Sequence, residues 1–365
     1  MAGRKKKKIL RVGVIGCGRI ADVHLRAAYE AEGVKLVACC DVIKERARAT
    51  AAEYGIRAYT DFRKMIRRKR LHAVHICLPP YLHSVVANYC FLKKVHVISE
   101  LPMAIDPENA ESAVRFAELT GVQYGVILQY RYNAPTLFVK EALASGKLGR
   151  ILSARSVLTW SRPDSYYEEC SWRGTWEKAG GGVVISEAIH EIDLVNWLVG
   201  SEVDTVSCTM TNRAHSSHFV EDSAEGLITY KNGVRYGFYC MNNYESDAPA
   251  EIHLACEHGE VTFGHRGAVI RYHDGRIAEM NEKDAAIYGY RGYRGSRHAA
   301  QIHQFYRACR GEEELEVSGR AALATHRLIY ALYEEAERRG IHLFGREEPE
   351  APAKSLHEGE RIWYY

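Results

Sequence analysis

The chain has 365 residues, enough for two domains that each bury a core of their own. Its composition, 47% hydrophobic and 26% charged, is typical of a globular enzyme, and a net charge of +3 argues against a protein that binds nucleic acid or an acidic membrane through its overall charge. No apolar stretch reaches the roughly eighteen residues of a membrane helix. No hydrophobic segment follows the basic run at residues 4–8, as one would in a signal peptide. We therefore expect a cytoplasmic protein, and we interpret the basic run as a solvated extension rather than an arm for nucleic acid or lipid.

A short apolar strand at residues 12–15 leads directly into Gly16-x-Gly18-x-x-Ala21 and a helix. In such a turn the first glycine permits the tight bend and the second lets the backbone approach phosphate groups. A small residue at the third position allows close packing of helix on strand. The free N–H groups at the start of the helix then face an anion. The pattern predicts a binding site for the pyrophosphate of a dinucleotide.

A second apolar strand, residues 34–40, ends at Asp41, twenty residues after Ala21. A carboxylate at this place can accept hydrogen bonds from the ribose diol of NAD, and it repels the 2′-phosphate of NADP. Arg46 is a nearby cation that could partly offset the repulsion. We predict NAD as the cofactor, with NADP as the alternative.

The first 125 residues alternate short apolar strands with helical segments, which predicts a parallel, doubly wound sheet of the Rossmann type. Beyond Asp41 we expect helices at 44–54, around 63–68, after 80 and at 107–120, and strands at 73–78, 95–98 and 122–128. The fold class is therefore α/β for this half.

The pattern changes after residue 125. We expect strands at 151–160, 203–212, 224–231, 234–242, 251–257, 260–264 and 268–273, and helices at 182–198, 297–310 and 319–339. Turn signals at 231–233, 257–259 and 274–275 predict hairpins in an open, mostly antiparallel or mixed sheet. We divide the chain into a dinucleotide-binding domain at 1–125, an α+β domain for substrate binding and oligomerisation at 126–345, and a tail at 346–365. The ten cysteines include no Cys-x-x-Cys pair, which fits buried thiols in a reducing compartment better than disulfides or zinc ligands.

The order and spacing of several motifs resemble the glucose-fructose oxidoreductase/inositol dehydrogenase/MocA family. These motifs are Gly16-x-Gly18-x-x-Ala21-x-x-His24, Pro79-x-x-x-His83, Glu100-Leu101-Pro102, Gln129-Tyr130-Arg131-Tyr132, Trp172-Arg173-Gly174-Thr175-Trp176, Gly180-Gly181-Gly182 and Ala188-Ile189-His190-x-Ile192-Asp193. The Trp-Arg-Gly-Thr-Trp segment is similar to the branch that contains sugar and nucleotide-sugar dehydrogenases. The resemblance implies an NAD(P)-dependent oxidoreductase acting on a sugar, polyol or sugar derivative, and a homo-oligomer (dimer or tetramer) formed through the second sheet.

The motifs and the resemblance together suggest the residues of the site, without a metal. The residues expected at the cofactor are Gly16, Gly18, Arg19, Ile20, Ala21, Asp41, Arg46, Leu78, Pro79, His83 and Glu100. The residues expected at the substrate are Leu101, Tyr130, Arg131, Trp172, Arg173, Ser186, Glu187 and His190. A structural role, at a strand end, in the core or on the surface, is the alternative for several of these side chains.

The chain departs from the family pattern at two positions. Family members usually carry a lysine where this chain has Leu101, and an Asp or Asn where it has Ser186. Leucine neither donates nor accepts a proton, so His190 is left as the best acid–base group. On a helix beginning at residue 182, Asp193 would share a face with His190, Ser186 and Glu187, and it would orient the imidazole.

Other interpretations are also compatible with the sequence. Because Leu101 cannot transfer a proton, one alternative is a non-catalytic regulator that binds a dinucleotide and a sugar. NAD-dependent, redox-assisted cleavage of a glycoside would use the same scaffold. A metal site at Glu187, His190 and Asp193 is conceivable but lacks a further ligand cluster. His190 could also simply cap a helix or pack beneath the sheet.

Overall fold

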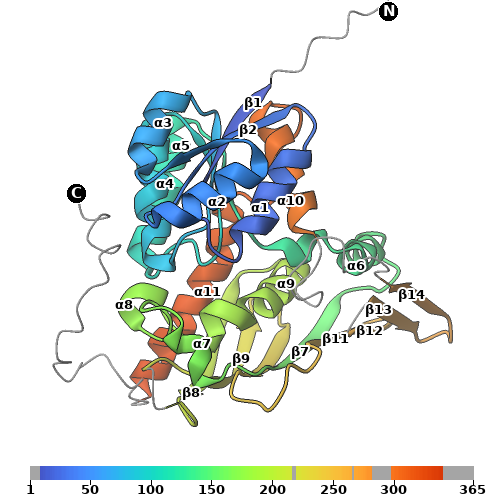
Figure 1. Cartoon of the computed structure of the whole chain (residues 1–365). Helices are drawn as coiled ribbons and strands as arrows, with labels where there is room; N and C mark the ends of the chain where they lie inside the picture. The colour runs from blue at the N-terminus through green and yellow to red at the C-terminus, as the bar shows by residue number, and fades with distance from the viewer. Residues whose placement is uncertain (1–8, 216–218, 265–266, 282–296, 340–365) are drawn as a thin grey trace, which may run out of the picture.

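The computed structural model describes residues 9–215, 219–264, 267–281 and 297–339. The basic run at 4–8 and the predicted tail at 346–365 lie outside these ranges. Figure 1 shows two sheets: a first sheet flanked by helices, and below it a second, wider sheet with helices between the two. None of the helices in the described ranges is long and apolar enough to cross a membrane.

The first sheet contains six parallel strands in the order β3-β2-β1-β4-β5-β6. The strands are β1 (Leu10–Ile15), β2 (Val34–Cys40), β3 (Arg57–Tyr59), β4 (Ala73–Ile76), β5 (His96–Ser99) and β6 (Tyr124–Val126). The strand order reverses between β1 and β4, which is the switch point where dinucleotides bind in such sheets. The predicted doubly wound sheet is confirmed, and only the short edge strand β3 was not predicted.

Helices pack on both faces of this sheet: α1 (Ala21–Glu30), α2 (Lys44–Tyr54), α3 (Phe62–Lys69), α4 (His83–Leu92) and α5 (Pro107–Thr120). Helix α5 illustrates why the sequence places them there. Asp106 accepts a hydrogen bond from the Asn109 N–H at 2.8 Å, Pro107 occupies the first helical position, and Gly121 ends the helix with a left-handed φ of 69°. These residue types are the ones that favour helix starts and stops.

The second sheet contains eight strands in the order β14-β13-β12-β11-β7-β10-β9-β8, and all neighbours are antiparallel except β7 and β10. The strands are β7 (Ile151–Thr159), β8 (Val203–Thr211), β9 (Ser223–Tyr230), β10 (Arg235–Met241), β11 (Glu251–Cys256), β12 (Gly259–Gly264), β13 (Gly267–Tyr272) and β14 (Ile277–Asn281). The mixed sheet that was predicted is confirmed, although β14 was not predicted.

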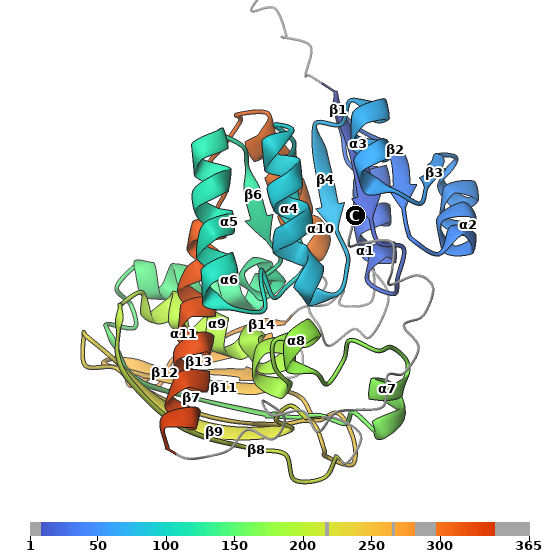
Figure 2. The same ribbon diagram turned by 90° about the vertical axis from the view of Figure 1, so that its left-hand side faces the viewer.

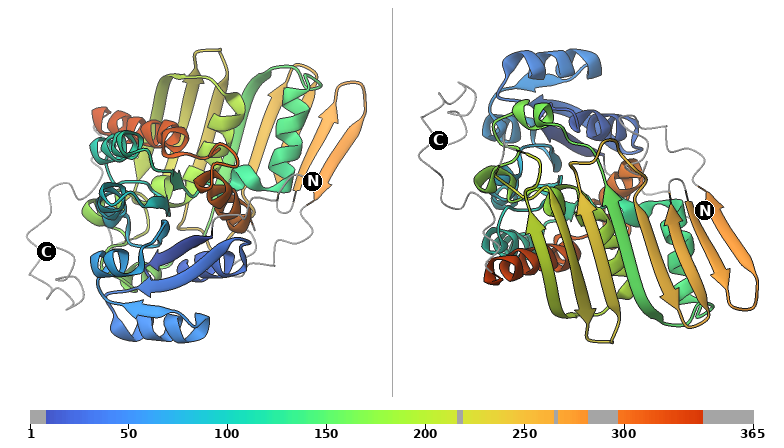
Figure 3. Two further views of the ribbon diagram at one scale, coloured as in Figure 1. Left: turned by 90° about the horizontal axis from the view of Figure 1, so that it is seen from above. Right: turned by 90° about the horizontal axis from the view of Figure 1, so that it is seen from below.

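Burial alternates along the strands of the second sheet, as in a sheet covered on one face. Helices α6 (Ala134–Ala144), α9 (Ile189–Val199) and α11 (Gly319–Arg338) pack on the covered face. The right-hand view of Figure 3 shows the opposite face, over which no helix of the described ranges lies.

The helix predicted at 182–198 has two parts. A π-helical turn, η3 (Val184–Ala188), precedes α9, which ends at Gly200 with a left-handed φ of 61°. The π turn widens the helix by a residue, so side chains on either side of it do not follow the spacing of a regular α-helix.

Two helices from the end of the described chain connect the halves. Helix α10 (His298–Cys309) packs on α1, and its Ile302, Phe305 and Tyr306 complete the apolar core around β1. Helix α11 runs past both sheets, against α5 and β6 above and against α9 and β8 below (Figure 2). The two halves are therefore joined by packed helices as well as by the chain between β6 and β7.

Candidate active site

The glycine turn after β1 has the shape that a dinucleotide requires. Gly16 has a φ of +96°, and a Cβ atom built on it would lie 2.0 Å from the carbonyl oxygen of Cys77. A Cβ on Gly18 would meet nothing within 4 Å, so the turn is open at this residue. Helix α1 begins after Ile20 with no side-chain cap, and Ala21 is buried against the sheet. The open turn at Gly18 and the uncapped start of α1 fit the pyrophosphate of a dinucleotide.

Asp41 lies directly after β2 and next to the glycine turn. Its carboxylate accepts hydrogen bonds from the backbone N–H of Cys17 at 2.9 Å and of Ile43 at 2.8 Å. A carboxylate can accept more than two hydrogen bonds, so it can also receive a ribose diol. Arg46 lies on the exposed side of α2.

The loop after β4 is fixed by His83. Its Nδ1 lies 2.7 Å from the carbonyl oxygen of Pro102, and its Nε2 lies 2.7 Å from that of Leu78. Burial lowers the pKa of His83, although the two carbonyls oppose that shift. This residue, predicted at the cofactor, is fully occupied by backbone groups, so it shapes the crevice by tying the loops after β4 and β5. Pro79 precedes the single 3₁₀ turn η1 (Pro80–Leu82) in that loop.

Glu100 lies at the end of β5 and contacts two imidazoles. His24 Nε2 is 2.9 Å and His298 Nε2 is 3.5 Å from its Oε1 atom. Burial by itself would raise the pKa of Glu100, but the hydrogen bonds from these histidines lower it below its ordinary value. The neighbouring Leu101 is half-buried and packs against the core. The end of β5 therefore carries an ionised carboxylate beside an apolar side chain.

His190 stacks on Tyr130, with ring centroids 4.7 Å apart and planes inclined by 18°. Tyr130 belongs to the 3₁₀ turn η2 (Gln129–Tyr132), which follows β6 closely, and α10 packs on the same turn. The imidazole comes from the first turn of α9 in the second half. The structure thus brings a half-buried histidine from one half to the strand ends of the other.

Asp193 does not orient His190, contrary to the expectation from helical spacing. Its carboxylate accepts hydrogen bonds from Arg131 Nε at 2.9 Å, Arg131 Nη2 at 2.5 Å and the Thr325 hydroxyl at 2.7 Å. Arg131 is only 4% exposed, so it needs this counterion and does not present its guanidinium to a substrate. Both residues are better interpreted as supports beneath the site.

Glu187 is also paired with an arginine. Its Oε1 lies 2.8 Å from Arg162 Nε, and both side chains are buried. Arg162 also contacts Asp247 at 2.9 Å. Ser186 is the exposed member of the predicted face, and its hydroxyl donates to the Gly182 carbonyl at 2.6 Å. Of the four side chains expected on one face, Ser186 and His190 are therefore the ones that remain accessible.

A segment of the second half reaches the glycine turn. Glu169 follows α7 (Asp164–Glu168) and pairs with Arg19 at 2.7 Å and with Arg173 at 2.9 Å. The Arg173 guanidinium stacks on Tyr166 at 4.1 Å and lies 5.2 Å from the ring centre of Trp172. The ion pair with Arg19 therefore holds the segment of Trp172 and Arg173 next to the glycine turn.

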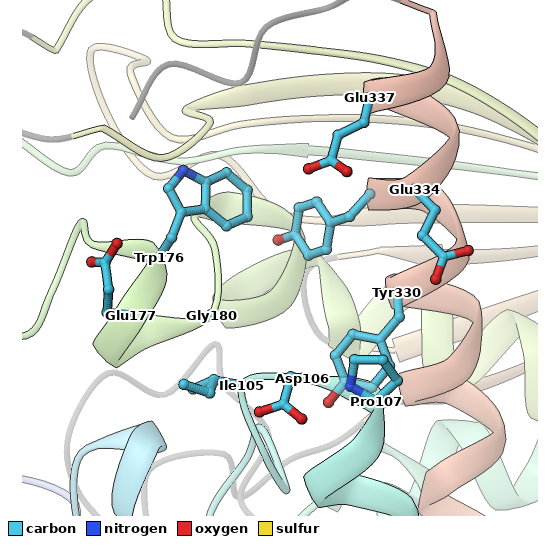
Figure 4. A pocket seen from close by; sticks show the side chains of 10 residues that line it. Ile105, Asp106, Pro107, Trp176, Glu177, Gly180, Tyr330, Glu334 and Glu337 are labelled. Atoms are coloured by element: carbon cyan, nitrogen blue, oxygen red, sulfur yellow. The ribbon is translucent and has the colours of Figure 1, made fainter. Parts of the chain in front are cut away.

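A separate cavity of about 440 Å³ opens between α5, α8 (Trp176–Ala179) and α11 (Figure 4). Its lining combines aromatic and acidic side chains: Trp176, Tyr330, Tyr333, Asp106, Glu177, Glu334 and Glu337. None of the residues predicted at the cofactor or the substrate lines it. The cavity is therefore distinct from the candidate site.

Sequence reasoning missed several buried polar groups near the site. Arg162 was not singled out because its partners are distant in the chain. Glu221 accepts hydrogen bonds from the N–H groups of Gly182 and Val184 and from the Tyr333 hydroxyl, and burial raises its pKa to about 7. A signal was present at His75, a histidine in the middle of a buried strand. In the described ranges, no group of three or more His, Cys, Asp or Glu side chains is placed to hold a metal ion.

A glycine turn at a switch point, with an imidazole brought to the strand ends, defines a dinucleotide-binding fold of the Rossmann class. Two family models match the chain: "Oxidoreductase family, NAD-binding Rossmann fold" over residues 10–128 and "GFO/IDH/MocA C-terminal domain" over residues 136–262. Together they cover more than half of the sequence, so the chain belongs to the Gfo/Idh/MocA family of NAD-binding oxidoreductases.

Relatives and solved structures agree with this assignment. The chain is 28% identical over 257 residues to "Oxidoreductase P35" of Formosa agariphila, covering 69% of this chain and 78% of that protein. It is 26% identical over 230 residues to "1,5-anhydro-D-fructose reductase" of Ensifer adhaerens, covering 63% and 68%. The WlbA dehydrogenase from Bordetella pertussis, solved with NADH and UDP-GlcNAcA, superposes with a TM-score of 0.81 at 29% identity, covering 91% of this chain and 96% of that chain.

Proposed function

We propose that the protein transfers a hydride between the nicotinamide of NAD and a carbinol carbon of a sugar, polyol or sugar derivative, with His190 as the proton acceptor or donor. The observation that carries the proposal is the position of His190, stacked on Tyr130 at the strand ends of the nucleotide half. An alcohol that is oxidised to a ketone loses its hydroxyl proton while the hydride leaves carbon. An imidazole with a pKa near neutrality suits that transfer.

Each neighbouring residue has a distinct part in this mechanism. Tyr130 holds the imidazole plane by stacking. Arg131 and Asp193 fix η2 to α9 beneath the two rings. Leu101 supplies no proton, but its apolar side chain excludes water near the reacting carbon. Ser186 offers an exposed hydroxyl to the substrate. When bound, NAD supplies the hydride acceptor for the oxidation.

The substrate class is supported by the relatives, among them the reductase of 1,5-anhydro-D-fructose and the WlbA dehydrogenase solved with a nucleotide sugar. Stacking faces and fixed donors, such as Trp172 and Arg173, suit a sugar ring or a nucleotide sugar. NAD is favoured over NADP by Asp41, whose carboxylate lies at the glycine turn. We also expect a cytoplasmic homo-oligomer, with its interface on the open face of the second sheet.

The test is a turnover assay with NAD and a panel of sugars, inositols and nucleotide sugars, in which the absorbance of NADH reports the reaction. Replacing His190 with Ala is expected to lower kcat roughly 10²–10⁴-fold. His273→Ala is the matched control, because this exposed histidine lies on the far β13–β14 hairpin and is expected to leave turnover unchanged. Full turnover in the His190 variant would remove the assigned proton acceptor. Coenzyme binding without turnover would favour a regulator, and a cleaved glycoside without net NADH would favour redox-assisted cleavage.

A further inference from the structure

A chain of polar contacts runs from Glu100, directly after β5, into the core beneath α1 and α10. The Tyr306 hydroxyl lies 2.6 Å from His75 Nε2, and His75 Nδ1 lies 2.8 Å from His24 Nδ1. His24 Nε2 in turn lies 2.9 Å from Glu100 Oε1, and His298 contacts the same oxygen at 3.5 Å. We call these five residues the Glu100 network.

The hydrogen positions follow from these contacts and from burial. Burial lowers the pKa of His75 well below its ordinary value and raises the pKa of Tyr306 well above its own, so His75 is neutral and Tyr306 keeps its proton. One assignment of the tautomers satisfies all three contacts: Tyr306 donates to His75 Nε2, His75 donates from Nδ1 to His24 Nδ1, and His24 donates from Nε2 to Glu100. In this assignment every donor of the chain points toward Glu100.

The network places its charge at its more exposed end, after β5. His24 and His75 are 0% exposed and Tyr306 is 1% exposed, whereas the Glu100 side chain is 13% exposed. Because the hydrogen bonds from His24 and His298 stabilise the ionised carboxylate, Glu100 carries a fixed negative charge. The imidazoles of His24 and His298 are its ion-pair partners when they are protonated, and the neighbouring Leu101 adds no further cation.

The position of Glu100 relative to the switch point indicates what this charge meets. Dinucleotides lie across the strand ends where the strand order reverses, here between β1 and β4. Asp41, after β2, marks the side expected for the adenosine ribose. Glu100, after β5, lies on the opposite side of the switch point, the side expected for the nicotinamide. The oxidised nicotinamide ring is a cation and the reduced ring is neutral, so a nearby anion attracts the two forms unequally.

We propose that Glu100 makes the protein bind oxidised NAD in preference to the reduced form, and that His24, His75 and Tyr306 are positioning residues that keep its carboxylate in place. The inference rests on the coenzyme site of the proposed function, and it concerns binding rather than turnover. It identifies a residue that biases the resting protein toward the coenzyme form needed for oxidation of an alcohol.

The test compares the dissociation constants of NAD and NADH, measured by calorimetry, in the wild type and three variants. Glu100→Gln removes the charge and keeps the shape, and it is expected to raise the ratio of the NAD constant to the NADH constant about tenfold. Tyr306→Phe removes the outermost donor, and it is expected to shift the ratio in the same direction by about twofold to threefold. Glu118→Gln, at an exposed carboxylate paired with Arg320, is the control and should leave the ratio unchanged.

The outcomes separate this inference from the proposed function. If the wild type binds both coenzymes and Glu100→Gln leaves their ratio within twofold, the inference is wrong and the proposed function stands. If the wild type binds neither coenzyme, both are wrong. Melting curves report whether each variant folds; should Glu100→Gln not fold, an unchanged ratio in Tyr306→Phe overturns the inference.

Discussion

The two halves of the molecule form their parts of the site in different ways. In the nucleotide half, the turn at Gly16 and the carboxylate of Asp41 are set by short runs of sequence at the ends of adjacent strands. In the second half, the site stands on ion pairs between distant residues. Arg131 and Asp193 are 62 residues apart, and Arg162 and Asp247 are 85 residues apart. The first half therefore depends on backbone geometry, and the second on matched buried charges.

The largest effect on coenzyme binding should come from the backbone of the first half. Gly16→Ala forces a left-handed residue and places a Cβ atom 2.0 Å from the Cys77 carbonyl, so the turn must move. We expect coenzyme binding to weaken at least about 100-fold, because the phosphate-binding N–H groups are displaced. Calorimetry with NAD measures this loss.

The control for that variant is Gly55→Ala. Gly55 also has a left-handed φ, +65°, but a Cβ atom there meets nothing within 4 Å. It should cost about 1 kcal/mol of stability and leave coenzyme binding intact. Equal binding by the two variants would mean that the turn at Gly16 does not hold the phosphates.

The largest effect on stability should come from the buried charges of the second half. Asp193→Ala leaves Arg131 buried without a counterion, and we expect the free energy of unfolding to fall by about 3–5 kcal/mol. Urea denaturation measures the change. Glu111→Ala, which breaks an exposed pair with Arg327, should cost less than about 1 kcal/mol. A similar small loss for both variants would show that the buried pair does not support α9.

The smallest effect should come from a buried acid that lies outside these pairs. Glu191 is 1% exposed, neither of its carboxylate oxygens has a hydrogen-bond partner among the described residues, and burial raises its pKa to about 8. The folded protein thus holds a proton that the unfolded chain releases above its ordinary pKa of 4.5. Stability should therefore fall as the pH rises from about 4.5 to about 8.

Glu191→Gln removes this source of pH dependence. The free energy of unfolding of the variant minus that of the wild type should rise by about 2–3 kcal/mol from pH 6 to pH 8.5. Denaturation at both pH values measures this difference. The residual dependence should include Glu221, whose pKa is also raised by burial. The exposed Glu334→Gln serves as the control. If this difference changed with pH no more than it does for the control, Glu191 would already be ionised in the folded protein at neutral pH.

The same contrast explains what the sequence could predict. Apolar periodicity and turn residues were sufficient for both sheets except the edge strands β3 and β14, and glycine spacing was sufficient for the dinucleotide turn. The arrangement of η3 and α9 was not predictable, because nothing in helical spacing signals a π turn. Spacing placed Asp193 beside His190, whereas the structure pairs it with Arg131. The arginine that pairs with Asp193 can be identified only from the tertiary fold, because a buried carboxylate pairs with the cation that packing places next to it.

The Glu100 network shows a related limit. His24 and Glu100 were both singled out as parts of motifs, but their contact depends on α1 lying next to the end of β5. His75 was visible only as a polar residue in an apolar strand, and Tyr306 comes from a helix 231 residues further along the chain. Neither partner could be chosen before the strand order and the return of α10 were known.

The return of α10 to the first sheet restricts how this protein can be dissected. An excised fragment ending near residue 128 would retain the whole glycine turn but lack the side chains of Ile302, Phe305 and Tyr306 that cover β1 and α1. Such a fragment would expose apolar surface and aggregate rather than fold as an independent nucleotide-binding domain. A transplant of this domain into another protein has to carry the segment at 298–309 with it.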